Sequence, residues 1–109
     1  MLPKQYRLPV GVSFQNARSA TTPHFSFRWI STENSQNRYG FIVSKKVDSR
    51  AVMRNRAKRM LRQCVEQYQD SMAVSYDFLF TVRKNFVNFT LKQLEEEFVD
   101  VLTQNNLLK

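Results

Sequence analysis

The sequence predicts an α+β fold in which helices pack on one small sheet. Hydrophobic residues make up 42% of the 109 positions, a share typical of a folded globule. Only two Gly and three Pro are present, and no repeat or low-complexity tract is visible, so we expect residues 1–109 to form a single domain. Apolar residues recur at strand or helix spacing in the order helix, strand, strand, helix, strand, helix. Layering the helices on the sheet would bury both kinds of apolar face.

The elements expected before residue 31 are a short helix and a first strand. Pro3 and Pro9 keep the opening residues extended or irregular. Apolar side chains at helical spacing predict a helix over residues 10–18, and residues 19–23 are expected as a break. Residues 24–30 alternate between large apolar and polar side chains, which predicts a half-buried strand.

The second strand is expected to lead into the longest helix. Residues 31–37 are polar and fit a hairpin loop, after which residues 38–47 begin as a strand. Gly40 inside that strand predicts close approach by another backbone or by a ligand. Asp48 and Ser49 are both suitable N-cap residues for the helix that follows.

Helical spacing is clearest over residues 51–68. The apolar stripe of this helix consists of Met53, Ala57, Met60, Leu61, Cys64 and Tyr68. Residues 76–82 are rich in Phe and β-branched residues and predict a third strand. Asn88 or Thr90 can cap a last helix that runs to about residue 107.

The formal net charge of +8 is concentrated in one segment. Residues 38–62 hold nine Lys and Arg residues and one acidic residue, Asp48, while the rest of the chain is neutral overall. Along the predicted helix, Arg54, Lys58 and Arg62 are successive i, i+4 neighbours, whose repulsion costs an isolated helix about 0.2–0.5 kcal/mol per pair. Such a patch favours a nucleic acid as partner, with a plain solvated helix face as the alternative. A membrane-surface role fits less well, because the apolar stripe lacks a large aromatic face.

The residues predict no catalytic site and no metal site within the chain. The acidic residues are scattered, and those at positions 95–97 point in different directions on the predicted last helix, whereas hydrolytic metal sites need converging carboxylates. Asp77 could bind a metal, but a strand-edge or capping role is favoured. His24 is the only histidine, so an acid–base pair of two histidines is excluded. Cys64 lies on the apolar stripe and is expected in the core.

We expect a cytoplasmic location. A single cysteine rules out an intramolecular disulfide and fits a reducing compartment. The opening residues contain two prolines and no apolar run long enough for a secretory signal. No apolar stretch is long enough to span a bilayer, so no membrane partner is expected.

The start of the long helix and the segment before it carry a specific motif. Residues 44–47 read Ser-Lys-Lys-Val, and residues 51–59 read Ala-Val-Met-Arg-Asn-Arg-Ala-Lys-Arg, followed by Leu61 and Arg62. This constellation closely resembles the signature of the bacterial ribonuclease P protein family. The opening segment and the third strand also look like their counterparts in that family, so the resemblance covers most of the chain.

The resemblance implies an α/β sandwich with a small central sheet and a left-handed β-α-β crossover, similar to the second domain of ribosomal protein S5. It also implies a ribonucleoprotein endonuclease, a hydrolase that removes the 5′ leader of precursor tRNA in tRNA processing. The implied partners are the ribonuclease P RNA and the precursor tRNA, with no obligate protein partner. Catalysis is implied to rest on the RNA subunit and its Mg²⁺, which this chain does not itself hold.

By position, the resemblance implies two groups of contact residues. Those expected to contact the ribonuclease P RNA are Lys45, Lys46, Arg54, Asn55, Arg56, Lys58, Arg59 and Arg62. Those expected near the leader of the precursor tRNA are Phe14, Ser26, Arg28 and Tyr39. Arg18 and Arg28 stand where many relatives carry aromatic residues, so leader contacts are expected to be more ionic here. The turn at residues 48–50 is one residue longer than is common in the family, which leaves the path into the helix open.

Three other interpretations compete with this one. A general RNA-binding or ribosomal protein of similar fold would differ by not preferring the ribonuclease P RNA over ribosomal RNA. A DNA-binding regulator is disfavoured because no second helix, joined by a short turn, precedes the basic helix. A stand-alone nuclease is disfavoured by the missing catalytic groups.

Overall fold

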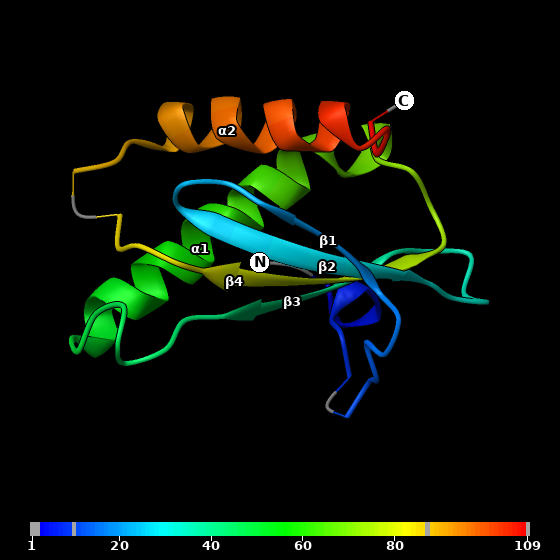
Figure 1. Ribbon diagram of the computed structural model, residues 1–109, viewed down its shortest axis with the longest axis horizontal. Helices are drawn as coiled ribbons and strands as arrows, with labels where there is room; N and C mark the ends of the chain where they lie inside the picture. Colours follow the sequence, from blue (N-terminus) through cyan, green and yellow to red (C-terminus); the bar gives the residue numbers. More distant parts are fainter. Residues whose placement is uncertain (1–2, 10, 87, 109) are drawn as a thin grey trace.

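The computed structural model describes residues 3–9, 11–86 and 88–108, which form a small sheet with two α-helices (Figure 1). The strands are β1 (Arg18–Thr21), β2 (Phe25–Ser31), β3 (Arg38–Ile42) and β4 (Tyr76–Val82), and the helices are α1 (Ala51–Tyr68) and α2 (Leu91–Gln104). Single 3-10 turns lie at Lys4–Tyr6 and Gln69–Ser71. The predicted α+β class is confirmed, and α1 and β4 have the predicted bounds.

β4 lies inside the sheet, whose strand order is β1-β2-β4-β3. β2 pairs antiparallel with both β1 and β4, whereas β3 pairs parallel with β4. Residues 31–37 therefore do not close a hairpin, and that prediction was wrong. The later strand β4 takes the place between β2 and β3, because its alternate apolar side chains are buried between theirs. The sequence of residues 31–37 carries no information about β4, which follows much later in the chain and pairs between β2 and β3.

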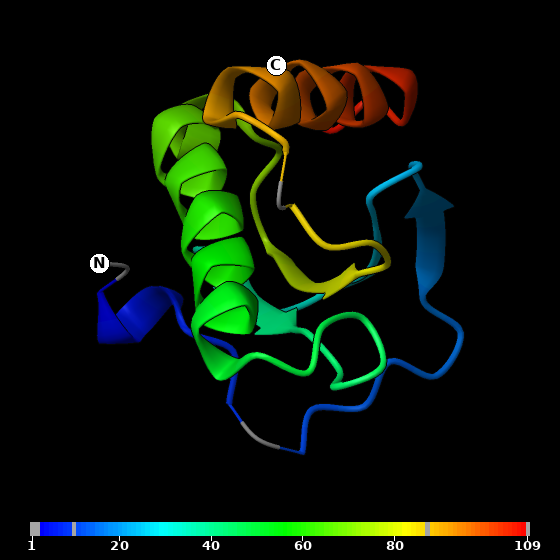
Figure 2. The ribbon, with the colours of Figure 1, turned by 90° about the vertical axis from the view of Figure 1, so that its left-hand side faces the viewer.

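α1 connects the parallel strands β3 and β4 by crossing behind the sheet in the view of Figure 1. Seen with the strands pointing up and α1 toward the viewer, β4 lies to the left of β3, so the crossover is left-handed. This is the rare hand for such a connection, and it is the one that the family resemblance implies. Figure 2 shows α1 beside the sheet and α2 lying across the top.

The core lies between the two helices and one face of the sheet. Aromatic rings fill much of it, because side chains alternate along each strand and most inward positions of β2 and β4 carry Phe or Trp. The core rings are Phe25, Phe27 and Trp29 of β2, Tyr39 of β3, Phe78 and Phe80 of β4, and Phe98 of α2. The opposite side of the sheet, here called the open face, carries Ser26, Arg28, Ile30, Gly40, Ile42, Leu79 and Thr81.

The N-terminal segment lies across part of the open face. The Leu8 N–H donates to the Tyr39 carbonyl at 2.9 Å. A Cβ at Gly40 would lie 3.0 Å from Leu8 Cδ2 and 3.1 Å from Leu79 Cδ1. The close approach predicted at Gly40 therefore exists, but the approaching group is the Leu8 side chain rather than a ligand.

The helix predicted over residues 10–18 does not form in its described part, and Val10 lies outside the described residues. Gly11 and Asn16 have positive φ angles of 87° and 64°, which no α-helix contains. Three of the four residues of β1, residues 19–21, lie in the segment expected as a break. β1 is a short, mostly exposed edge strand, so it has no apolar alternation to reveal it.

Thr90 is the N-cap of α2, which settles the alternative between Asn88 and Thr90. The Thr90 hydroxyl accepts from the Gln93 N–H, and the Gln93 side chain accepts from the Thr90 N–H, so the two form a capping box. α2 ends at Gln104, earlier than predicted, and the chain turns back so that Leu107 is still buried. Neither helix in the described ranges has the length and apolarity needed to cross a membrane.

Truncation of a core residue on α1 tests this packing. Leu61 is fully buried, so Leu61→Ala should lower the free energy of unfolding by about 2–5 kcal/mol through lost contacts and a residual cavity. Val52 lies on the same helix but is 76% exposed, so Val52→Ala should change that free energy by less than about 0.5 kcal/mol. Urea denaturation followed by circular dichroism measures both; equal losses would contradict the placement of α1.

Candidate nucleic-acid interface

The eight residues predicted to contact RNA lie together on α1 and on the turn before it. We call this set the basic surface; it consists of Lys45, Lys46, Arg54, Asn55, Arg56, Lys58, Arg59 and Arg62. Lys45 and Lys46 are exposed in the turn that follows β3, and Asn55 and Arg59 are exposed on α1. The remaining four side chains are half-buried at the flanks of the helix. The apolar stripe of α1 packs on the sheet, so the basic surface faces outward.

The turn before α1 is held by its own charged groups. The Asp48 carboxylate accepts from Arg50 Nε and Nη2 at 2.9 and 2.7 Å and from the Arg50 N–H at 2.9 Å. These bonds lower the pKa of Asp48 to about 2. Arg50 is the N-cap, so neither Asp48 nor Ser49 caps the helix as predicted. Arg54 Nη1 donates to the carbonyls of Asp48 and Ser49, which closes the longer turn onto the helix.

Arg56 points to a different part of the chain. Its Nη1 and Nη2 donate to the carbonyls of Phe86 and Phe89, at 2.5 and 3.2 Å. These carbonyls belong to the connection between β4 and α2, which also carries the exposed cations Arg83 and Lys84. Arg56 thus joins that connection to α1. Arg83 does not extend the basic surface, because its Nη1 donates to the Thr22 carbonyl at 2.7 Å, in the turn between β1 and β2. Sequence reasoning missed the tie that Arg56 makes, because it depends on a tertiary contact between distant segments.

The other residues of the basic surface make fewer contacts with the rest of the chain. The Arg62 guanidinium lies over the Phe41 ring of β3, 5.9 Å from its centroid. Among the described residues, no hydrogen bond or ion pair involves the side chains of Lys45, Lys46, Asn55, Lys58 and Arg59. Unpaired cations on one outward surface are the arrangement that phosphate groups neutralise.

Three of the four predicted leader residues meet on the open face. Arg28 Nη2 donates to the Phe14 carbonyl at 2.8 Å, and its guanidinium carbon lies 5.9 Å from the centre of the Phe14 ring. Ser26 lies on the same face two residues earlier in β2 and is partly exposed. Phe14 itself is buried, with 8% of its surface exposed, so the group presents the Arg28 guanidinium and the Ser26 hydroxyl above a buried ring. A guanidinium plane and a hydroxyl can contact the bases of a single-stranded nucleic acid.

Tyr39 does not join these three residues. It is 2% exposed and stacks on Phe78 on the helix-covered face of the sheet. Asn37 Nδ2 donates to its hydroxyl at 3.2 Å, and burial raises the pKa of Tyr39 to about 12. Because side chains alternate along each strand, Tyr39 and Arg28 lie on opposite faces of the sheet, and Tyr39 makes no contact on the open face.

Other chemistry-bearing groups are engaged in the fold. Asp77 accepts two hydrogen bonds from Arg38 of the neighbouring strand β3, at 2.8 and 2.7 Å. It lies on the inner strand β4, so its role is an ion pair across the sheet rather than the strand-edge or capping role favoured above. His24 Nδ1 lies 3.0 Å from a Glu97 carboxylate oxygen. Burial raises the pKa of the Cys64 thiol to about 12. Within the part of the chain that the structure describes, no three His, Cys, Asp or Glu residues converge where they could hold a metal ion.

Comparison with known proteins agrees with these features. The family model described as Ribonuclease P matches residues 2–106. The ribonuclease P protein component of Pelotomaculum thermopropionicum is 32% identical over 88 residues, which cover 81% of this chain and 78% of the relative. The protein component of Xanthomonas campestris is 36% identical over 97 residues, which cover 89% of this chain and 64% of the relative.

Solved structures show the same fold. The RNase P protein of Staphylococcus aureus superposes with a TM-score of 0.82 at 24% identity, covering 95% of this chain and 98% of that one. The RNase P protein of Thermotoga maritima superposes with a TM-score of 0.79 at 19% identity, covering 90% and 96%. With a family match over nearly the whole sequence, the motif at residues 44–62 is explained: the chain belongs to the family of ribonuclease P protein components.

Proposed function

We propose that this chain binds the catalytic RNA of ribonuclease P through the basic surface and holds the 5′ leader of precursor tRNA on the open face. The observation that carries the proposal is the gathering of unpaired cations on the outward side of α1 and the turn before it. The holoenzyme that the family name implies contains an RNA subunit, and phosphates are the groups these cations would neutralise.

The basic surface divides into two kinds of residue. Arg59 and Lys58 have no internal partner among the described residues, so their full charge is available to phosphates. Arg54 and Arg56 each donate hydrogen bonds to backbone carbonyls. They therefore fix the shape of the surface as well as contributing positive charge to it. Arg has five N–H donors, so these two can still present N–H groups to an RNA.

The open face supplies a different kind of contact. The buried Phe14 ring and carbonyl hold the exposed Arg28 side chain, and the guanidinium offers an unpaired base both a planar surface and a charge. Only two cations, Arg18 and Arg28, occur on β1 and β2, so we expect weaker electrostatic binding there than on α1. This suits a leader that must be released after cleavage.

We assign the hydrolysis itself to Mg²⁺ held by the RNA subunit. Metal-assisted phosphodiester cleavage needs carboxylates or phosphates that converge on the ion. The acidic residues of the described chain are instead separate or paired with Arg and His, as at Asp48, Asp77 and Glu97. RNA phosphates supply the missing ligands, and the chain contributes by neutralising phosphates and positioning the substrate.

A cleavage assay tests the whole proposal. A precursor tRNA with a 5′ leader is incubated at low Mg²⁺ with a bacterial ribonuclease P RNA, with this chain, or with both. We expect cleavage at the mature 5′ end only when both are present, because the protein offsets repulsion between the two RNAs. If the protein adds nothing with its cognate RNA, the general RNA-binding interpretation replaces ours. Cleavage by the protein alone would show that the chemistry resides in this chain.

Replacing Arg59 or Arg56, two arginines of the same motif, should affect different properties of the protein. Arg59→Ala should leave the unfolding free energy unchanged within about 0.5 kcal/mol and reduce the log–log salt slope of RNA binding by about 0.7–0.9. Arg56→Ala should lower that free energy by about 1–3 kcal/mol, because the Phe86 and Phe89 carbonyls lose their donors. Urea denaturation and filter binding over a salt series measure both quantities. Equal stability of the two variants would remove the distinction between them.

Arg28 tests the leader contact separately from RNA assembly. Arg28→Ala should weaken binding of precursor tRNA to the holoenzyme and lower its salt slope, while leaving binding of mature tRNA unchanged. Lys92→Ala is the matched control, because Lys92 is an exposed cation on α2. An unchanged salt slope in Arg28→Ala, measured with a precursor that carries its leader, would refute the contact.

A further inference from the structure

The connection between β4 and α2 is held from two sides. From α1, Arg56 donates to the carbonyls of Phe86 and Phe89. From the turn before β2, the His24 carbonyl accepts from the N–H groups of residues 83–84, at 2.8 and 3.2 Å. The Phe89 ring also stacks on the His24 ring, with 3.9 Å between centres and 15° between planes. One short segment therefore contacts both the basic helix and the residue that precedes β2.

His24 is also fixed to α2. Its N–H donates to Glu97 Oε2 at 3.2 Å, its Nδ1 lies 3.0 Å from Glu97 Oε1, and the Thr22 hydroxyl donates to Glu97 Oε2 at 2.5 Å. The side chains of His24 and Glu97 are only 25% and 16% exposed. Because His24 directly precedes β2, these contacts fix the start of the strand that carries Ser26 and Arg28.

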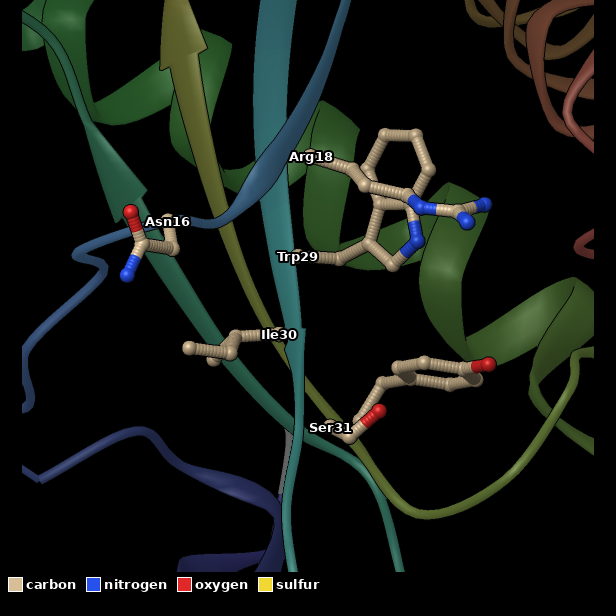
Figure 3. A pocket seen from close by; sticks show the side chains of 6 residues that line it. Asn16, Arg18, Trp29, Ile30 and Ser31 are labelled. Atoms are coloured by element: carbon tan, nitrogen blue, oxygen red, sulfur yellow. The ribbon is translucent and has the colours of Figure 1, made fainter.

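The far end of β2 is less enclosed. Trp29, Ile30 and Ser31 line an open pocket there, and Figure 3 shows Trp29 and Ile30 on opposite sides of the strand. The pairing with β1 ends at Trp29, so no strand of the described chain lies beside Ile30 and Ser31 on that edge. On this edge, β2 is therefore held by β1 and by the turn at its start, which contains His24.

Arg56 is shared between this turn and the basic surface. Its side chain is half-buried on α1, and its two terminal nitrogens donate to the carbonyls of the connection. The remaining N–H groups of the guanidinium can meet a phosphate. A phosphate carries a full negative charge, so it attracts a guanidinium more strongly than a neutral carbonyl does. An RNA phosphate at Arg56 would therefore compete with the connection for this side chain.

We propose that Arg56 is an RNA-sensitive tie. In the free chain it holds the connection against His24. When a phosphate binds at the basic surface, the guanidinium moves toward the phosphate, and its bonds to the Phe86 and Phe89 carbonyls weaken. The Phe89 ring then loosens from His24, at the start of β2. The inference rests on the proposed function, and it adds that RNA assembly on α1 alters how the strand of Ser26 and Arg28 is held.

His24 makes the proposal measurable, because it is the only histidine in the chain and its ring signals are unique in a proton NMR spectrum. The Phe89 ring current shields these signals as long as the two rings are stacked. A short RNA duplex is titrated into the full protein to saturation at about pH 8.5, where a free imidazole is neutral throughout. We expect the His24 ring signals to move downfield, toward the position of an unstacked imidazole.

Two variants remove the tie and leave His24 and Glu97 in place. In Arg56→Ala and in Phe89→Leu, the His24 signals should already lie downfield in the free protein, and the duplex should move them little. Arg59→Ala is the matched control, because the Arg59 side chain has no partner among the described residues. It should bind the duplex more weakly and still show the full shift at saturation. Dispersed methyl signals verify that each variant folds.

The outcomes separate this inference from the proposed function. His24 signals that do not move at saturation overturn the tie. An equal movement in Arg56→Ala also overturns it, because the duplex would then act on His24 without Arg56. In both cases, weaker duplex binding by Arg59→Ala still supports the basic surface. If Arg59→Ala binds the duplex as tightly as the unchanged chain, the basic surface is wrong and both proposals fail.

Discussion

The packing of α1 against the sheet is the constraint on which the remaining structure depends. Ala57, Leu61 and Cys64 are buried in the core that α1 shares with the sheet, and α1 itself connects the strands β3 and β4. The rotation of the helix is thereby determined, because burying this stripe leaves only one side for Asn55 and Arg59. The left-handed crossover places β4 inside the sheet and leaves β3 at its edge beside the cations of α1. The same packing that builds the core therefore also orients the basic surface.

The sheet separates the two surfaces that we propose as nucleic-acid contacts. On the helix side, α1 presents cations from a rigid element, which suits a permanent RNA partner. On the open face, Arg28 and Phe14 form a smaller site held by the irregular N-terminal segment. A binding site on a loop is easier to displace than one on a helix, because fewer buried contacts hold it. The arrangement matches the different lifetimes that a subunit RNA and a cleaved leader require.

The parts that could be predicted from the sequence are those whose signals are local. α1 and β4 have clear periodicity, and their bounds follow from it. β1 could not be predicted, because its polar residues become a strand only by pairing with β2. Tyr39 was assigned to the leader by family resemblance. Alternation groups the residues of β3 by face but does not say which face meets the core, so it could not correct that assignment. The contact of Arg56 with the Phe86 and Phe89 carbonyls joins distant segments, so it could not be predicted from the motif around Arg56.

The like-charge row on α1 shows how a helix with concentrated positive charge is stabilised within the fold. Arg54, Lys58 and Arg62 repel one another at i, i+4 spacing, and no acidic side chain on α1 offsets this before Glu66. Two of the three nevertheless find partners: Arg54 lies on the turn carbonyls, and Arg62 lies over the Phe41 ring. Carbonyl oxygens and ring faces attract a cation without neutralising it. Acidic partners would have cancelled the field of the basic surface, whereas these contacts stabilise the helix and leave its charge available to the RNA that we propose as its partner.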